Sequence, residues 1–317
     1  MKRKKILVVG ELNVDMIFNH IDGFPAVGKE IVAKNLDLTL GSSSAIFASN
    51  ISTLGIETSF CGKVGTDTFG KVVLDTLSQR GVDVSHIIQD PQEKTGVTMV
   101  MNYDQDRANI TYCGAMEHFG FDDIPWERVQ EFDHVHFSNL FLQPKLKKDI
   151  AAFFQKIKSL GLSTSLDLQT DPDGTFDFDY QACLPFVDIF LPNESEIKGI
   201  TKESELSLAI EKVAPHAKIL VVKMGERGCL LRQGDLVIEL PAMHHTSFVD
   251  AIGAGDSFNA GFIHHFLSGE PIDSCLEFAN LTGAVNTTAS GGTSAFGSFE
   301  MFASTAKKVF NIHTAQL

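Results

Sequence analysis

Positive charge is what the sequence most lacks: 26 lysines and arginines stand against 40 aspartates and glutamates, a formal net charge of −14. Proteins that bind nucleic acid or an anionic membrane do so largely through clustered Lys and Arg side chains. The excess of acid argues against both kinds of partner. We therefore expect small-molecule ligands.

Cysteine is also scarce and shows no pattern. The five cysteines are scattered and none is spaced as C-x-x-C, which excludes a disulfide framework and a zinc ribbon. The basic start is followed by only four apolar residues, Ile6–Val9, too few for the apolar region of a signal peptide. No other run approaches the length of a membrane span, so we expect a cytoplasmic protein.

Three common enzyme motifs are missing as well. The chain has no G-x-x-x-x-G-K-[ST] P-loop, no complete G-x-G-x-x-G after its first strand and no G-x-S-x-G nucleophile elbow. The P-loop ATPases, the dinucleotide-binding Rossmann enzymes and the α/β-hydrolases are therefore poor matches.

Short β-branched runs do alternate with helical patterns along the 317 residues, which is typical of an α/β protein with a mostly parallel sheet. The first predicted strand is Ile6–Val9, a later one is Lys218–Lys223, and predicted helices include Phe69–Arg80 and Leu146–Leu160. No long linker or repeat interrupts the chain, so we expect a single domain over residues 1–317.

Two regions depart from this alternation, Val14–Leu40 and Gly96–Tyr112. In the second, Val97–Met101 and Ala108–Tyr112 flank the polar turn Asp104–Arg107, which predicts a β-hairpin. The two regions together predict a small second sheet beside the main one.

The segment Gly253-Ala254-Gly255-Asp256 is the richest in chemistry. Free N–H groups at a helix start attract anions, and glycine lets phosphate oxygens approach the backbone. A carboxylate beside such a site is costly unless it acts on a neighbouring group, for example by taking a proton from an attacking hydroxyl. This pairing suits phosphoryl transfer to an alcohol, with Asp256 as the base. The alternative is that Asp256 merely caps a helix.

Five segments share a resemblance with one family. D-A-I-G-A-G-D-S-F resembles the C-terminal signature D-T-x-G-A-G-D-x-F of the ribokinase-like (PfkB) carbohydrate kinases, with Ala251 in place of threonine. V-V-G-E-L-N-V-D, L-G-I-E-T-S-F-C-G-K-V-G-T-D-T-F-G, P-N-E-S-E and V-V-K-M-G-E-R-G resemble further family segments in the expected order. The resemblance implies a three-layer α/β/α core with a small β-sheet lid.

The family pattern assigns roles to residues of this sequence. It makes Asp256 the catalytic base and the amides of Gly253, Ala254 and Gly255 an anion hole. Asn193 and Glu196 match the N-x-x-E motif that organises Mg²⁺, mostly through water, although Asn193 could equally be an ordinary helix cap.

The resemblance also implies an ATP site. Lys223 and Gly225 match a nucleotide-binding corner, with an ordinary solvated lysine as the alternative reading of Lys223. Asn280 and Gly291 fall in the family's nucleotide-binding tail, whose loop Asn286–Gly297 could otherwise be simply flexible. Asp250 and nearby carbonyls are candidate ligands for K⁺, although Ala295 stands where some relatives carry a hydroxyl.

On the substrate side, Asn13 and Asp15 match a position that binds sugar hydroxyls. Gly41 and Ser42 begin a segment in which Ile46 replaces an asparagine that commonly touches the sugar, so we expect ribose to be a poor substrate. Asn50, one turn further on, either compensates or lies at the margin of the core.

A lid formed by residues 12–40 and 95–113 is expected over the substrate. Arg107 and Tyr112 are candidate substrate contacts from this lid, with ordinary surface positions on an exposed β-face as the alternative. Asp167 ends another strand and is a further candidate. We also expect that a homodimer could form through the lid.

The function predicted from the sequence is therefore an ATP-dependent kinase of a small carbohydrate, using Mg²⁺. A nucleoside kinase of the same fold and a non-catalytic sugar sensor are the alternatives. Retention of Asp256, Asn193 and Glu196 argues against the sensor.

Overall fold

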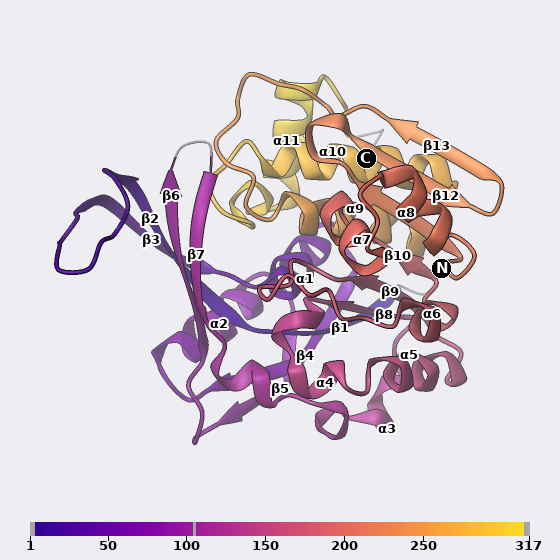
Figure 1. The fold of residues 1–317 in the computed structure, drawn as a ribbon, viewed down its shortest axis with the longest axis horizontal. Coiled ribbons are helices and arrows are strands. Elements are labelled where there is room, and N and C mark those ends of the chain that lie inside the picture. Colours follow the sequence, from indigo (N-terminus) through magenta and orange to yellow (C-terminus); the bar gives the residue numbers. More distant parts are fainter. Residues whose placement is uncertain (1–3, 104–105, 314–317) are drawn as a thin grey trace.

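A nine-stranded, mostly parallel sheet forms the centre of the computed structural model, which describes residues 4–103 and 106–313 (Figure 1). Neighbouring strands follow the order β13-β12-β11-β10-β9-β8-β1-β4-β5, and β12 runs antiparallel to its two neighbours β11 and β13 whereas all other pairs are parallel. The strands are β1 (Lys5–Val9), β4 (Glu57–Gly65), β5 (Asp83–Asp90), β8 (His134–Ser138), β9 (Ser163–Asp167), β10 (Ile189–Phe190), β11 (Ile219–Lys223), β12 (Cys229–Gln233) and β13 (Leu236–Leu240).

Helices cover both faces of this sheet. Side chains of β1 alternate between two hydrophobic clusters, with Ile6 and Val8 in one and Leu7 and Val9 in the other. One face packs against α1 (Ser43–Thr53), α2 (Thr68–Gln79), α9 (Ala254–Ser268) and α10 (Ile272–Asn286). The opposite face packs against α3 (Trp126–Val129), α4 (Pro144–Lys147), α5 (Ile150–Ser159), α6 (Tyr180–Cys183), α7 (Glu194–Thr201) and α8 (Leu206–Val213). The predicted three-layer α/β/α core is confirmed.

The remaining helices lie around these layers. Helix α11 (Phe299–Phe310) packs on α10 through a third hydrophobic cluster. Short 3₁₀ helices are η1 (Gly114–His118), η2 (Phe121–Asp123), η3 (Leu140–Leu142), η4 (Leu184–Phe186), η5 (Gly225–Arg227) and η6 (Ser294–Phe296). Among the residues that the structure describes, no helix has the length and apolar character needed to cross a bilayer.

A separate four-stranded sheet projects from the core at the left of Figure 1, and we call it the β-lid. Its order is β3-β2-β6-β7, with strands β2 (Asn13–Ile21), β3 (Ala33–Leu40), β6 (Gly96–Tyr103) and β7 (Asp106–Tyr112). The predicted hairpin is confirmed by the antiparallel pairing of β6 with β7. Asp104 and Gln105 of its predicted turn lie outside the described residues. All four strands fall within residues 12–40 and 95–113.

Two local predictions need correction. The single helix predicted for Leu146–Leu160 is wrong, because the chain leaves the helical region at Asp149, where φ is −111° and ψ is 13°, and so forms α4 and α5 separately. The antiparallel hairpin of β12 and β13 is not among the predicted elements. It turns at Gly234, which has a φ of 58°.

Candidate active site

Most candidate site residues lie at the carboxyl ends of the parallel strands. Glu11 follows β1, Asp167 ends β9, Asn193 follows β10 and Lys223 ends β11. Asp256 reaches the same edge from the first turn of α9. Ligands of open α/β sheets bind at this edge, so the topology explains why residues far apart in sequence meet here.

The turn before α9 requires glycine. Gly253 has a φ of 74°, and a Cβ atom on it would lie 2.5 Å from the Cα of Gly292. A Cβ on Gly255 would lie 3.6 Å from Lys223 Nζ, which places the ammonium group beside the turn. The amide of Ala254 donates to Ala251 O at 3.3 Å. Helix-start amides and a lysine together make an electropositive site suited to phosphate.

Asp256 is buried, with 6% of its surface exposed, and its side chain does not cap α9. Its Oδ1 accepts a hydrogen bond from Gln169 Nε2 at 3.0 Å. Burial, followed by the charge of Asp167, raises the pKa of Asp256 well above its ordinary range, while Lys223 opposes the change. A carboxylate whose pKa is raised in this way is better matched to taking a proton from an alcohol.

Lys223 is not the solvated lysine of the alternative reading. Its Nζ donates to Asp167 Oδ2 at 2.8 Å, with side-chain exposures of 12% for Lys223 and 0% for Asp167. Asn259 Nδ2 donates to the same oxygen at 2.6 Å. Burial alone would lower the pKa of Lys223, but Asp167 and Glu196 outweigh it and raise that pKa. The site therefore contains a fixed cation.

Asn193 and Glu196 form a capping box at the start of α7. The side chain of Asn193 accepts from Glu196 N at 2.9 Å, and Glu196 accepts from Asn193 N at 2.9 Å and Nδ2 at 2.6 Å. The helix-cap reading of Asn193 is thus correct as local structure. Burial, then the charge of Asp167, raises the pKa of Glu196 to about 8.

These two residues fit Mg²⁺ only through water. Both carboxylate oxygens of Glu196 are hydrogen-bonded to Asn193. Over residues 4–103 and 106–313, no three His, Cys, Asp or Glu side chains come close enough together to bind a metal directly. Mg²⁺ usually keeps several waters and binds one or two carboxylates plus phosphates, which agrees with this donor set.

Asn13, Asp15 and Gly41 form a polar corner. A Cβ on Gly41 would lie 2.2 Å from Asp15 Oδ1 and 2.6 Å from Asn13 Oδ1, so only glycine fits. Asn13 Nδ2 donates to Thr98 Oγ1 at 2.6 Å, whereas Asn13 Oδ1 is buried and has no partner. Burial raises the pKa of Asp15 to about 6. An unpaired buried acceptor beside a carboxylate is suited to adjacent hydroxyl groups.

Ser42 keeps a backbone conformation typical of glycine. Its φ is 69°, and its Oγ both caps α1 by accepting from Ala45 N at 3.0 Å and donates to Glu11 O at 2.6 Å. Serine therefore holds the loop before α1 in a left-handed conformation, at a cost that its hydrogen bonds offset.

The buried carboxylate of Glu11 lies next to this loop, and the sequence analysis did not single it out. It accepts from Ser43 Oγ at 2.9 Å, from Ser44 N and Oγ, and from Asn139 Nδ2 at 3.1 Å. The only signal in the sequence was its place one residue after Gly10, at the end of the first strand.

Asn50 is not a substrate contact in this structure. It is fully buried, and its Nδ2 donates to Ser257 Oγ at 2.9 Å and to Gly292 O at 3.0 Å. The side chain of Ile46 packs against two glycines. A Cβ on Gly292 would lie 2.4 Å from Ile46 Cδ1, and a Cβ on Gly253 would lie 3.1 Å from Ile46 Cγ2. Both residues brace the turn before α9.

Arg107 and Tyr112, the two candidate substrate contacts from the lid, lie on opposite faces of the β-lid. Arg107 pairs with Asn102 and so shares the face of Thr98 and Asp15, and its charge lowers the pKa of Asp15 against the larger effect of burial. Thr111 shares a hydrogen bond of 3.0 Å with Thr98, which also accepts from Asn13, so Thr111 is on the polar face. Adjacent residues of a strand point to opposite faces, and Tyr112, next to Thr111 in β7, is therefore on the other face. With 52% of its surface exposed, Tyr112 is wrong as a substrate contact.

The nucleotide candidates are Gly225 at the start of η5, Gly291 in the loop after α10, and Asn280 on α10. Gly225 has a φ of 59° just after β11, and Gly291 has a φ of 76°. Asn280 Nδ2 donates to Pro241 O at 2.8 Å. These three stay predictions.

The K⁺ candidates accept hydrogen bonds from neighbouring groups. Asp250 Oδ1 accepts from Ile252 N at 2.9 Å and Oδ2 from Gly291 N at 3.0 Å. The carbonyl of Ile252 accepts from Asn286 Nδ2 at 2.6 Å, and that of Gly292 from Asn50. Each of these oxygens therefore already accepts a hydrogen bond within the protein, and K⁺ stays a prediction.

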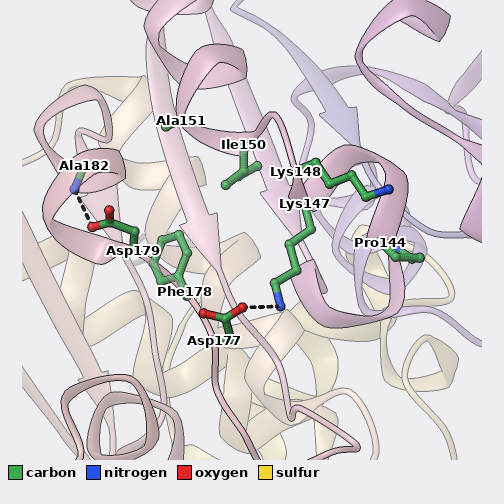
Figure 2. A pocket seen from close by; sticks show the side chains of 9 residues that line it. All are labelled: Pro144, Lys147, Lys148, Ile150, Ala151, Asp177, Phe178, Asp179 and Ala182. Carbon is green, nitrogen blue, oxygen red and sulfur yellow. Dashed lines mark hydrogen bonds and ion pairs between the residues drawn. The ribbon is translucent and has the colours of Figure 1, made fainter.

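A hollow of about 540 Å³ lies elsewhere on the surface (Figure 2). It is lined by residues of α4, α5 and α6 and the segment before α6, where Lys147 faces Asp177 at 3.9 Å. None of the predicted site residues lines it.

Comparison with known proteins gives a consistent family. The model of the "pfkB family carbohydrate kinase" matches residues 3–296. The chain belongs to the PfkB family of carbohydrate kinases. A nucleoside kinase of Methanothermobacter thermautotrophicus is 29% identical over 87% of this chain and 87% of its own. A fructokinase of Salmonella typhimurium is 30% identical over 80% of this chain and 88% of its own.

A solved structure extends the similarity to the fold. The ribokinase of Arabidopsis thaliana, complexed with ribose and ATP, has a TM-score of 0.81 at 25% identity, covering 96% of this chain and 99% of the other. Membership of the PfkB family makes this chain a phosphotransferase with an alcohol acceptor, a sugar or nucleoside kinase that uses ATP.

Proposed function

We propose that this PfkB-family protein is an ATP-dependent sugar kinase in which Asp256 is the general base. The observation that carries the proposal is the position of Asp256: a buried carboxylate in the first turn of α9, beside Lys223 and the glycine turn. General base and phosphate-binding site are thus adjacent, as phosphoryl transfer requires.

In the proposed mechanism, Asn13 Oδ1 and Asp15 accept hydrogen bonds from sugar hydroxyls and orient the acceptor. Asp256 takes the proton from the attacking hydroxyl as its oxygen bonds to the γ-phosphorus and the bond from that phosphorus to the ADP oxygen breaks. The Lys223 ammonium and the amides of Gly253 and Gly255 stabilise the charge on the transferred phosphoryl oxygens, and the amide of Ala254 would join them on exchanging its 3.3 Å hydrogen bond to Ala251 O. Gly225, Asn280 and Gly291 are proposed to contact the nucleotide.

Asn193 and Glu196 would hold Mg²⁺ through its waters, supported by the hydrogen bonds from Asn193 that fix both carboxylate oxygens of Glu196. When bound, Mg²⁺ neutralises phosphate charge. No step of the proposal uses K⁺.

A cytoplasmic location agrees with five cysteines that are all unpaired thiols.

A panel of sugars and nucleosides, assayed for ADP release, tests the substrate class. We expect turnover with at least one free sugar and none with Asp256→Asn, whose amide keeps the size of the carboxylate but cannot take the proton. Ligand-induced stabilisation without ADP release would identify a sensor. Preference for nucleosides would support the other kinase, because their ribose presents a similar diol.

We also propose that the β-lid carries a second copy of the chain. Its face opposite Asn13 and Asp15 is apolar over successive rows of paired residues. Leu38, Met16, Met99 and Ile110 form one row; in the next, Tyr112 is exposed whereas Leu40, Val14 and Val97 pack into the core. Several of these side chains are well exposed, including Leu38 at 45% and Ile110 at 58%. A flat apolar sheet face is best covered by another such face.

Sedimentation velocity tests this dimer. The wild type should sediment as a dimer and Ile110→Glu as a monomer. A matched change on the polar face, Asn109→Glu, should leave the dimer intact, and a monomeric wild type would contradict the proposal.

A further inference from the structure

Gln169 lies between the carboxylates of Asp167 and Asp256, and neither its residue type nor its position made it a candidate from sequence. It is the second residue after β9 and has a φ of 62°. A non-glycine residue in this region is strained, and such strain concentrates at functional sites. The conformation turns the chain at the strand end.

The side chain of Gln169 bridges Asp167 and Asp256. Its Nε2 donates to Asp256 Oδ1 and to Asp167 Oδ2, at 3.0 Å in both cases. Within the described chain, no hydrogen bond to Asp256 Oδ2 is found, and that oxygen is not among the fully buried ones. One oxygen of the base is thus held and the other is accessible.

We propose that Gln169 is the positioning residue of the base: it holds Asp256 by Oδ1 so that Oδ2 faces the acceptor hydroxyl. The inference rests on the proposed role of Asp256. Without the amide, the carboxylate can rotate about its side chain and turn toward the Lys223 ammonium, which would pair with it and remove it from the acceptor.

The surrounding charges make this neutral donor important. Asp256 faces Asp167 from β9, Lys223 from β11, Glu11 after β1 and Glu196 from α7, so three acids and one cation act on it. An N–H donor stabilises the ionised carboxylate in preference to the protonated form. Loss of the donor should therefore leave the base protonated up to a higher pH.

The test measures kcat against pH, at saturating ATP, Mg²⁺ and the preferred sugar, for Gln169→Ala and Gln169→Gly. The limb on which kcat rises with pH should shift to higher pH by about one unit in both variants. The loss of kcat should therefore be largest at low pH and largely recovered at high pH. Michaelis constants for ATP and sugar should change less than about twofold. Because glycine relieves the left-handed strain, Gln169→Gly also covers the case in which the alanine variant folds poorly.

Two further variants complete the design. Thr170→Ala, an exposed neighbour in the same loop, should keep the wild-type limb. Gln169→Glu keeps the length of the side chain but, once ionised, cannot donate a hydrogen bond and adds a negative charge. The rising limb of its kcat–pH profile should therefore lie at higher pH than that of Gln169→Ala. A uniform fall in kcat with an unmoved limb in Gln169→Ala and Gln169→Gly would overturn the inference. Full turnover by Asp256→Asn would instead overturn the proposed function on which it rests.

Discussion

Replacing Lys223 with methionine should expose how much the fold depends on this buried cation. The change keeps an unbranched side chain of similar length but leaves Asp167, fully buried, without the ammonium that lies 2.8 Å away. Removing one partner of a buried ion pair costs about 3–5 kcal/mol, because the remaining charge is uncompensated. Burial raises the pKa of both nearby acids, Asp256 and Glu196, so they add little like charge at pH 7.5 and we expect the loss to lie within that range.

Urea unfolding at pH 7.5, followed by circular dichroism, measures this loss. Lys223→Met combined with Asp167→Asn should be within about 1.5 kcal/mol of wild type, because both charges are removed and the asparagine oxygen can still accept from Asn259. Lys145→Met, which breaks an exposed pair with Asp123, is the control and should cost less than about 1 kcal/mol. If Lys223→Met costs no more than Lys145→Met, the reasoning about a tightly coupled buried pair is refuted.

Three more outcomes are expected. Glu196→Gln should raise the Mg²⁺ concentration needed for half-maximal rate, while sugar binding without nucleotide hardly changes; an unaltered Mg²⁺ titration would leave this residue a helix cap only. Asp15→Asn should be about 2–3 kcal/mol more stable than wild type at pH 8 and equal to it near pH 3. The pKa of Asp15 in the folded protein, about 6, lies above its ordinary value, so the wild type loses stability as the pH rises from that ordinary value to about 6. Denaturant unfolding at pH 8 and pH 3 checks the sign. Replacing K⁺ by choline should leave kcat unchanged, since Asp250 already has backbone donors, and a tenfold activation by K⁺ would contradict this reading.

Local sequence pattern was sufficient for the layers of the fold and for the family. The alternating strands and helices, the hairpin of β6 and β7 and the glycine turn before α9 all depend on residues near one another in sequence. The family segments added the order of the site residues along the chain. Asp256, Asn193 and Lys223 accordingly meet at one edge of the sheet.

The errors come from orientation, which the sequence pattern does not report. Tyr112 was selected for its type, but the register of β7 puts it on the far face of the β-lid. For Asn50 the spacing on α1 left two possibilities open, and the structure favours the core position over the substrate contact. Gln169 and Glu11 were missed because their roles depend on how strand ends from distant segments converge.

The β-lid also bears on the order in which the molecule folds. Its two hairpins are local, but they are joined by parallel pairing of β2 with β6, in which Asn13 aligns with Gly96 and Asp15 with Thr98. The chain between them forms α1, β4, α2 and β5, all part of the core. Closing so long a connection before the core exists would be entropically unfavourable. We therefore expect Asp15 and Thr98, which pair across β2 and β6, to be brought together late, so that a nascent chain acquires the polar corner of Asn13, Asp15 and Gly41 only after the elements beneath it have assembled.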